Sequence, residues 1–163
     1  KEKFGSDSGR DRANTMRDAL IQYGQEEGIP YQFDRITRRP NSFNAHRLVR
    51  WAQGQQKGAE AKEALFKAYF SDGRDIGETE VLVDMAREIN LDPSIVAELM
   101  PTDADVENVR NEEALFQQMG ISGVPTYIAH QRIAVQGAET AEKLAKFLQH
   151  AATQLPEERP AQG

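Results

Sequence analysis

Strand-like sequence is confined to one short region near the end of this chain, after a long series of helical segments. Thr126-Tyr127-Ile128 and residues 132–135 flank the turn AHQ, a pattern that predicts a β-hairpin. Since an isolated two-stranded hairpin is only marginally stable in water, this hairpin needs further strands or covering helices. The order of elements is therefore the one expected for the later part of a larger unit.

The residues before the hairpin carry apolar side chains at helical spacing, with glycines or capping residues at the predicted helix ends. Asp92 followed by Pro93 predicts a helix start. Thr102 and Asp105 have capping-box spacing, with Asp in place of the usual Glu or Gln. The predicted helices cover about residues 13–27, 40–54, 61–69, 78–90, 93–100, 102–119 and 141–151.

Residues 29–36 are predicted to be extended, because Pro30 is unsuited to a helix interior and aromatic residues alternate there. The pattern as a whole predicts a helical domain over residues 1–119, including a lead-in, and a hairpin-and-helix part over residues 120–153. Residues 154–163 are polar and contain proline, so we expect a disordered tail.

Composition excludes several classes of function. The net charge is −6, and the basic stretches RDR and RITRR are too short to form a phosphate-binding surface, which argues against nucleic-acid binding. No apolar run approaches the ~18 residues of a membrane span. The chain has no cysteine, so it can form no disulfide or thiolate metal site and can supply no thiol of its own.

No metal site is predicted either. The three histidines, His46, His130 and His150, do not have metal-ligand spacing. The stretch SDGRDIGETE is rich in acids, but an arginine occupies a ligand position of the calcium-loop pattern and the glycine is misplaced. We therefore interpret residues 71–80 as a turn between helices.

Two stretches resemble a known family. GISGVPTYI (120–128) followed by RIAVQGAE (132–139) resembles the second half of the thioredoxin fold, with an X-cis-Pro turn, two antiparallel strands and a C-terminal helix. PNSFNAHRLVRWAQGQ and the stretch from LFKAYF to EINLD resemble the helical insertion of DsbA-like proteins. Within that superfamily the chain, over about residues 1–150, is most similar to the FrnE-like branch, which is related to 2-hydroxychromene-2-carboxylate isomerases.

The resemblance implies an α/β thioredoxin-like fold of the DsbA type, mostly helical over these residues. Family members begin with a strand, a Cys-x-x-Cys motif, a helix and a second strand, and none of these is present. We therefore expect a segment upstream of Lys1 and expect this cysteine-free chain to be inactive alone. The branch also implies a bacterial, cytoplasmic protein without a cofactor.

The resemblance also assigns binding residues. Gly123, Val124, Pro125 and Thr126 would hold a thiol or disulfide substrate, either a protein or a small thiol, by pairing with the backbone of Val124. Gly120 and Gly123, which precede that proline, would allow a close approach of the backbone. A plain loop with a trans proline is the alternative.

Two residues of the NSFNAHR stretch are weaker candidates for contacts with a ligand in a groove. Asn41 lies where glutathione-using relatives contact the tripeptide, but Asn is also among the preferred helix N-caps. His46 lies on a predicted helix, where packing and hydrogen bonding are the alternative role. Phe66, Tyr69 and Phe70 are interpreted as core residues, one of which could line a ligand groove.

Three functions follow from these observations. The first is a thiol–disulfide oxidoreductase whose nucleophile is not in this chain. The second is a glutathione-dependent isomerase or transferase, with glutathione as substrate, and the third is a non-catalytic helical binding module. Because Tyr127, Ile128, Ile133 and Val135 would be left uncovered, we also expect self-association through the hairpin edge or the helical faces.

Overall fold

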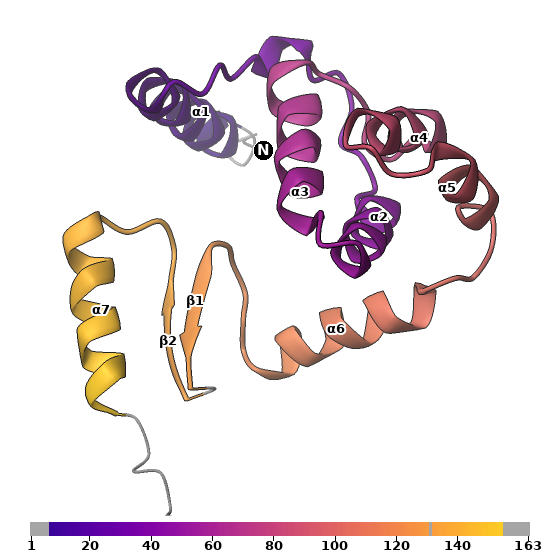
Figure 1. Cartoon of the computed structure of the whole chain (residues 1–163). Coiled ribbons are helices and arrows are strands. Elements are labelled where there is room, and N and C mark those ends of the chain that lie inside the picture. The colour runs from indigo at the N-terminus through magenta and orange to yellow at the C-terminus, as the bar shows by residue number, and fades with distance from the viewer. Residues whose placement is uncertain (1–6, 131, 155–163) are drawn as a thin grey trace, which may run out of the picture. The chain divides into compact units, whose positions relative to one another are not determined.

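The computed structural model describes residues 7–130 and 132–154, so the predicted disordered tail lies outside the described residues except for Gln154. Contacts divide the chain into two units, Lys1–Val109 and Arg110–Gly163, and helix α6 runs across this division. Figure 1 shows helices α1 to α5 preceding α6, with the hairpin and helix α7 after it.

Unit 1 is helical within its described residues. Its elements are α1 (Asp7–Glu27), the 3-10 turn η1 (Phe33–Arg35), α2 (Phe43–Gly54), α3 (Gly58–Phe66), the π-helical turn η2 (Lys67–Ser71), α4 (Thr79–Glu88), α5 (Pro93–Leu99) and the start of α6 (Val106–Gln118). The helices predicted from apolar spacing are thus confirmed. The helix start at Asp92 is confirmed too, since its side chain accepts hydrogen bonds from the backbone of Ser94 and Ile95.

The core of unit 1 lies between α2, α3, α4 and α5. Its fully buried side chains include Leu48 of α2, Ala61 of α3, and Leu82 and Met85 of α4. Burying one large aliphatic side chain contributes about 1.5–3 kcal/mol. Helix α1 differs, because the apolar residues of its predicted stripe are exposed at Met16, Leu20 and Tyr23.

Two predictions of secondary structure in unit 1 are wrong. Residues 33–35 form a 3-10 turn in the segment predicted to be extended. The segment pairs with no strand; instead Gln32 N donates to Phe70 O over 2.7 Å, and the rings of Tyr31 and Phe33 pack on Phe70. The capping box at residues 102–105 is not formed, because the carboxylate of Asp105 binds side chains of α2.

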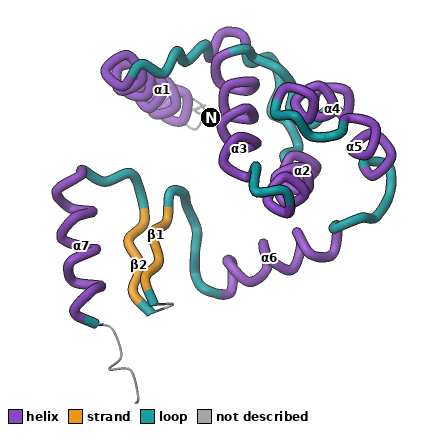
Figure 2. Tube along the Cα trace, viewed as in Figure 1, coloured by secondary structure: helices purple, strands orange, loops and turns teal. Residues whose placement is uncertain are grey.

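Unit 2 contains an antiparallel hairpin, β1 (Thr126–Ala129) and β2 (Ile133–Gln136), followed by α7 (Ala141–Thr153). Thr126 pairs with Gln136 and Ala129 pairs with Ile133, so the predicted hairpin is confirmed. Figure 2 shows the two strands and the loops that connect them to α6 and α7.

The described residues include no helix with the length and apolar character needed to span a bilayer.

Candidate functional site

The predicted substrate loop begins where α6 ends. Gly120 has a positive φ of 75°, which glycine adopts at little cost, and Ile121 N donates to Phe116 O over 3.0 Å. These two features stop the helix and direct the chain into residues 121–125. The Val124–Pro125 peptide bond is cis.

Hydrogen bonds hold the loop against the base of the hairpin. Thr126 Oγ1 donates to Gly123 O over 2.6 Å, and Gly137 N donates to Pro125 O over 2.8 Å. Gln136 Nε2 lies 3.4 Å from Gly120 O. The loop is therefore fixed at both ends by residues of unit 2.

Val124 is the residue that the loop presents. Its exposed fraction is 90%, and within the described part of the chain neither its backbone N–H nor its C=O has a hydrogen-bond partner. An exposed residue with both backbone groups unpaired can form hydrogen bonds with an extended chain, in the manner of an added strand. A Cβ placed on Gly123 would meet no described atom within 4 Å, so nothing in these residues requires a close approach there.

Asn41 and His46 lie in unit 1, whereas the loop lies in unit 2. Asn41 Oδ1 accepts a hydrogen bond from Phe43 N over 3.0 Å, so the side chain helps to start α2. His46 is exposed on the same helix, so the packed role considered for it is wrong. Neither residue lines the pocket described below.

The largest set of buried polar contacts surrounds Arg47, which the sequence analysis did not single out. Its exposed fraction is 2%. The guanidinium donates five hydrogen bonds of 2.8–3.0 Å, to the carbonyl oxygens of Leu99, Met100, Thr102 and Ala104 and to Asn44 Oδ1. It also lies over the Trp51 ring, with Cζ 5.1 Å from the ring centroid. Arg47 therefore fixes the segment after α5 onto α2.

Asp105 lies beside this arginine. Hydrogen bonds from Asn108, Arg50 and Trp51 hold the pKa of its carboxyl below the ordinary value, and Arg50 Nε lies 2.8 Å from Asp105 Oδ1. Burial lowers the pKa of the Arg47 guanidinium, while the nearby carboxylates oppose that shift. An arginine within the apolar pattern of residues 45–52 is the sequence signal that could have identified this cluster.

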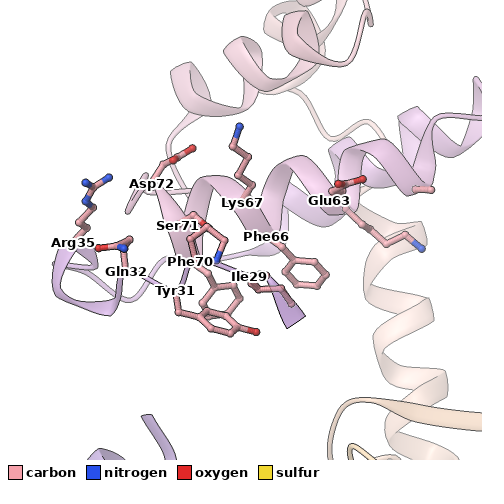
Figure 3. A pocket seen from close by; sticks show the side chains of 14 residues that line it. Ile29, Tyr31, Gln32, Arg35, Glu63, Phe66, Lys67, Phe70, Ser71 and Asp72 are labelled. Atoms are coloured by element: carbon pink, nitrogen blue, oxygen red, sulfur yellow. The ribbon is translucent and has the colours of Figure 1, made fainter. Parts of the chain in front are cut away.

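A pocket of about 1060 Å³ opens in unit 1. It is lined by the segment 28–35 and by residues of α3 and the π-helical turn. Figure 3 shows the rings of Tyr31, Phe66 and Phe70 beside Ile29, with Arg35 at one end. Phe66 is 62% exposed, so its interpretation as a core residue is wrong. Of the three aromatic residues interpreted as core, Phe66 and Phe70 line the pocket and Tyr69 does not.

Among the described residues no group of three or more His, Cys, Asp or Glu side chains is arranged to hold a metal ion. In the acidic stretch, Asp75 Oδ1 accepts from Gly77 N over 2.9 Å, and Arg74 pairs with Asp84 and Glu88. The acidic stretch is therefore held by a hydrogen bond within it and by ion pairs of Arg74 with α4.

Three comparisons place the chain among known proteins. The model of the DSBA-like thioredoxin domain matches residues 5–149. The uncharacterized protein YwbO of Bacillus subtilis (strain 168) is 26% identical over 103 residues, which are 62% of this chain and 51% of that protein. The crystal structure of a probable DsbA oxidoreductase from Streptomyces coelicolor is similar with a TM-score of 0.81 and 26% identity, covering 91% of this chain and 64% of that one.

The predicted fold class, a thioredoxin-like fold of the DsbA type, is confirmed by the domain match and by the similar crystal structure. The chain spans about half the length of the Bacillus protein and less than two thirds of the Streptomyces chain.

Proposed function

Because this chain belongs to the DsbA-like thioredoxin family, we propose that it forms the substrate-holding part of a thiol–disulfide oxidoreductase. The family and the similar Streptomyces protein support thiol–disulfide chemistry as the class of reaction. Within the family we assign the chain to the FrnE-like branch, on the NSFNAHR and GISGVPTYI stretches. A cytoplasmic location goes with that branch.

The observation that carries the proposal is the free backbone of Val124. Its N–H and C=O have no partner within the described residues, and the loop around it is fixed by the bonds of Thr126 and Gly137. A fixed loop loses little conformational freedom when a substrate pairs with it. The proposed role of residues 123–126 is to align an extended thiol or disulfide substrate by backbone hydrogen bonds.

The reacting sulfur has to come from outside these 163 residues, because they contain no cysteine. In thiol–disulfide exchange a thiolate attacks a disulfide sulfur and a mixed disulfide forms. A thiolate of low pKa, typical of Cys-x-x-Cys motifs at helix N-termini, would carry out that attack. The 163-residue chain is therefore proposed to bind substrate without turning it over.

Binding is tested by adding an extended peptide with one cysteine to the isotope-labelled chain and following the amide signals of residues 120–137. We expect shifts at Val124 and its neighbours, and weaker binding in V124P, which lacks the N–H. V124A is the matched control, since it removes the exposed side chain and retains both backbone groups. Equal binding by V124P and V124A, with circular dichroism showing both folded, would contradict the proposed pairing.

Turnover is tested by the reduction of insulin disulfides in the presence of dithiothreitol. The 163-residue chain is expected to leave the rate at that of buffer, and a clear acceleration would refute the external thiol. A glutathione-dependent isomerase is favoured instead if glutathione shifts the Val124 amide and cysteine peptides do not. If neither ligand produces shifts, a non-catalytic binding module is the better description.

A further inference from the structure

The pocket of unit 1 is shaped by the π-helical turn, residues 67–71, at the end of α3. Asp72 N donates to Lys67 O over 3.0 Å, which is the wider bond pattern of a π turn. The carbonyl of Phe70 then accepts from Gln32 N over 2.7 Å, so the segment that forms the other wall is tied to the turn. Single π turns of this kind are frequent at functional sites.

The pocket lining is apolar along the segment 29–31 and along Phe66 and Phe70, and parts of it are exposed. The Phe66 and Phe70 rings lie 6.2 Å apart, and Tyr31 meets Phe70 edge to face at 5.7 Å. Ile29 is 46% exposed beside them. An exposed apolar wall inside a concave site is the usual lining of a small-molecule pocket.

Ser71 gives the pocket a polar group that is not used within the chain. Its exposed fraction is 9%, it lines the pocket, and no described residue forms a hydrogen bond with its hydroxyl. Since no enclosed side-chain nitrogen or oxygen of the described residues lacks a hydrogen-bond partner, this unpaired hydroxyl is open to the pocket. It can therefore donate to, or accept from, an atom of a molecule bound there.

The charged residues of the lining indicate whether a bound molecule places a positive or a negative group in this pocket. The lining contains three cations, Arg35, Lys62 and Lys67, against the two carboxylates of Glu63 and Asp72. None of the three cations has an ion-pair partner among the described residues.

Arg35 lies at one end of the pocket, on the same side as Asp72 (Figure 3). The backbone of Arg35 approaches Gly73 so closely that a Cβ on the glycine would lie 2.7 Å from Arg35 O. Arg35 is thus held next to the end of the π-helical turn that carries Ser71, and Figure 3 shows it at the end away from Phe66. A guanidinium and an unpaired hydroxyl in the lining of a largely apolar pocket favour an anionic head group.

We propose that this pocket binds an elongated apolar molecule with one carboxylate, such as an alkyl carboxylate. The alkyl body lies along Tyr31, Phe66 and Phe70, and the carboxylate accepts hydrogen bonds from Arg35 and Ser71. The volume of about 1060 Å³ is at the upper end for small-molecule sites, which favours a long body over a single ring. This proposal stands without the oxidoreductase proposal, since it involves no thiol.

The probes are decanoate and its uncharged counterpart decanol, titrated into the 163-residue chain by calorimetry. We expect saturable binding of decanoate, about tenfold weaker in R35Q, because a charge-assisted hydrogen bond is lost. R35Q should leave the binding of decanol unchanged, and F66A should weaken both probes. S71A should weaken decanoate more than decanol.

The matched controls are R38Q and F116A, which remove a guanidinium and a ring from positions that do not line the pocket. Both are expected to bind the two probes as the unchanged chain does. The proposal is overturned if decanoate does not saturate, if R35Q and R38Q bind alike, or if F66A and F116A bind alike. Binding of 2-naphthoate in place of decanoate would likewise overturn the elongated alkyl body.

Discussion

Replacing Arg47 with lysine keeps the positive charge but removes the planar fork that joins α2 to residues 99–104. The guanidinium is 2% exposed and donates five hydrogen bonds from three nitrogen atoms. A lysine ammonium has three donors at a single point, so at least two of the five acceptors lose their partner. A buried acceptor left unpaired costs about 1–3 kcal/mol, and four of these five bonds are only partly buried. We therefore expect R47K to lower the free energy of unfolding by about 2–4 kcal/mol, below the upper limit for two fully buried acceptors.

The loss is measured by urea unfolding at neutral pH, followed by the fluorescence of Trp51. This residue is the sole tryptophan of the chain and contacts Arg47, so the signal reports on unit 1. With a slope of about 1–3 kcal/mol per molar urea, a loss of this size lowers the midpoint by about 1–2 M. R87K is the matched control, because Arg87 is exposed and pairs with Asp84 one helical turn away, a contact worth about 0.5 kcal/mol or less.

A second variant separates charge from hydrogen bonding. R47M has a similar volume and no donor, so it leaves all five acceptors unpaired, and we expect a loss at least as large as that of R47K. If R47K were no less stable than R87K, or if R47M were more stable than the unchanged chain, the carbonyls around this position would not depend on Arg47. The structural role given to the arginine would then be wrong.

Three further predictions concern other positions. The pKa of Asp105 is lower in the folded chain than in the unfolded chain, so on acidification the unfolded chain binds a proton at this carboxyl first. The free energy of unfolding should therefore fall as the pH drops below about 4. D105N should make that free energy less dependent on pH, as measured by urea titrations at several pH values. G73A should lower the free energy of unfolding by about 2 kcal/mol or more, because φ at Gly73 is +71° and the new Cβ would lie 2.7 Å from Arg35 O. G28A is the control, since Gly28 has a similar φ and no atom within 4 Å of the new Cβ, and it should lower the free energy by about half as much. Thermal unfolding measures both. If self-association runs through the helical faces, F116S should reduce it, because Phe116 is an exposed ring of α6. The change is seen as a lower mass in sedimentation runs, and an unchanged mass would exclude this ring from the contact.

The helices could be predicted from the sequence because their signals are local. Asp92 and Pro93 start α5 by contacts within three residues, and Gly120 ends α6 by its own backbone conformation. The hairpin was predictable for the same reason, since β-prone residues flank a short turn. Such signals depend on neighbouring positions and little on the rest of the fold.

The wrong predictions involve partners far away in the sequence. Asp105 has capping-box spacing from Thr102, but its carboxylate binds Arg50 and Trp51, which lie 55 and 54 residues earlier. Residues 33–35 turn because the segment packs on Phe70 and has no strand beside it. Spacing along the chain contains no information about these contacts.

The candidate sites differ in the same way. The loop at Val124, proposed to hold substrate, can be predicted through a family resemblance carried by nine consecutive residues. The pocket cannot, because the π-helical turn that shapes it shifts the helical period and has no sequence signal of its own. Phe66 and Phe70 fit a core stripe when the period is taken as regular, yet Phe66 is largely exposed.

Burial is distributed unevenly between the two units, and this bears on the substrate loop. The twelve residues of the main core cluster all belong to unit 1, whereas Ala151 is the one apolar residue of unit 2 that is buried among the described residues. A hairpin with Tyr127 and Ile128 more than a third exposed gains little from the hydrophobic effect by itself. A surface that covered those side chains would also stabilise the strand that follows Val124. We therefore expect covering this face and positioning the proposed substrate loop to depend on the same contacts.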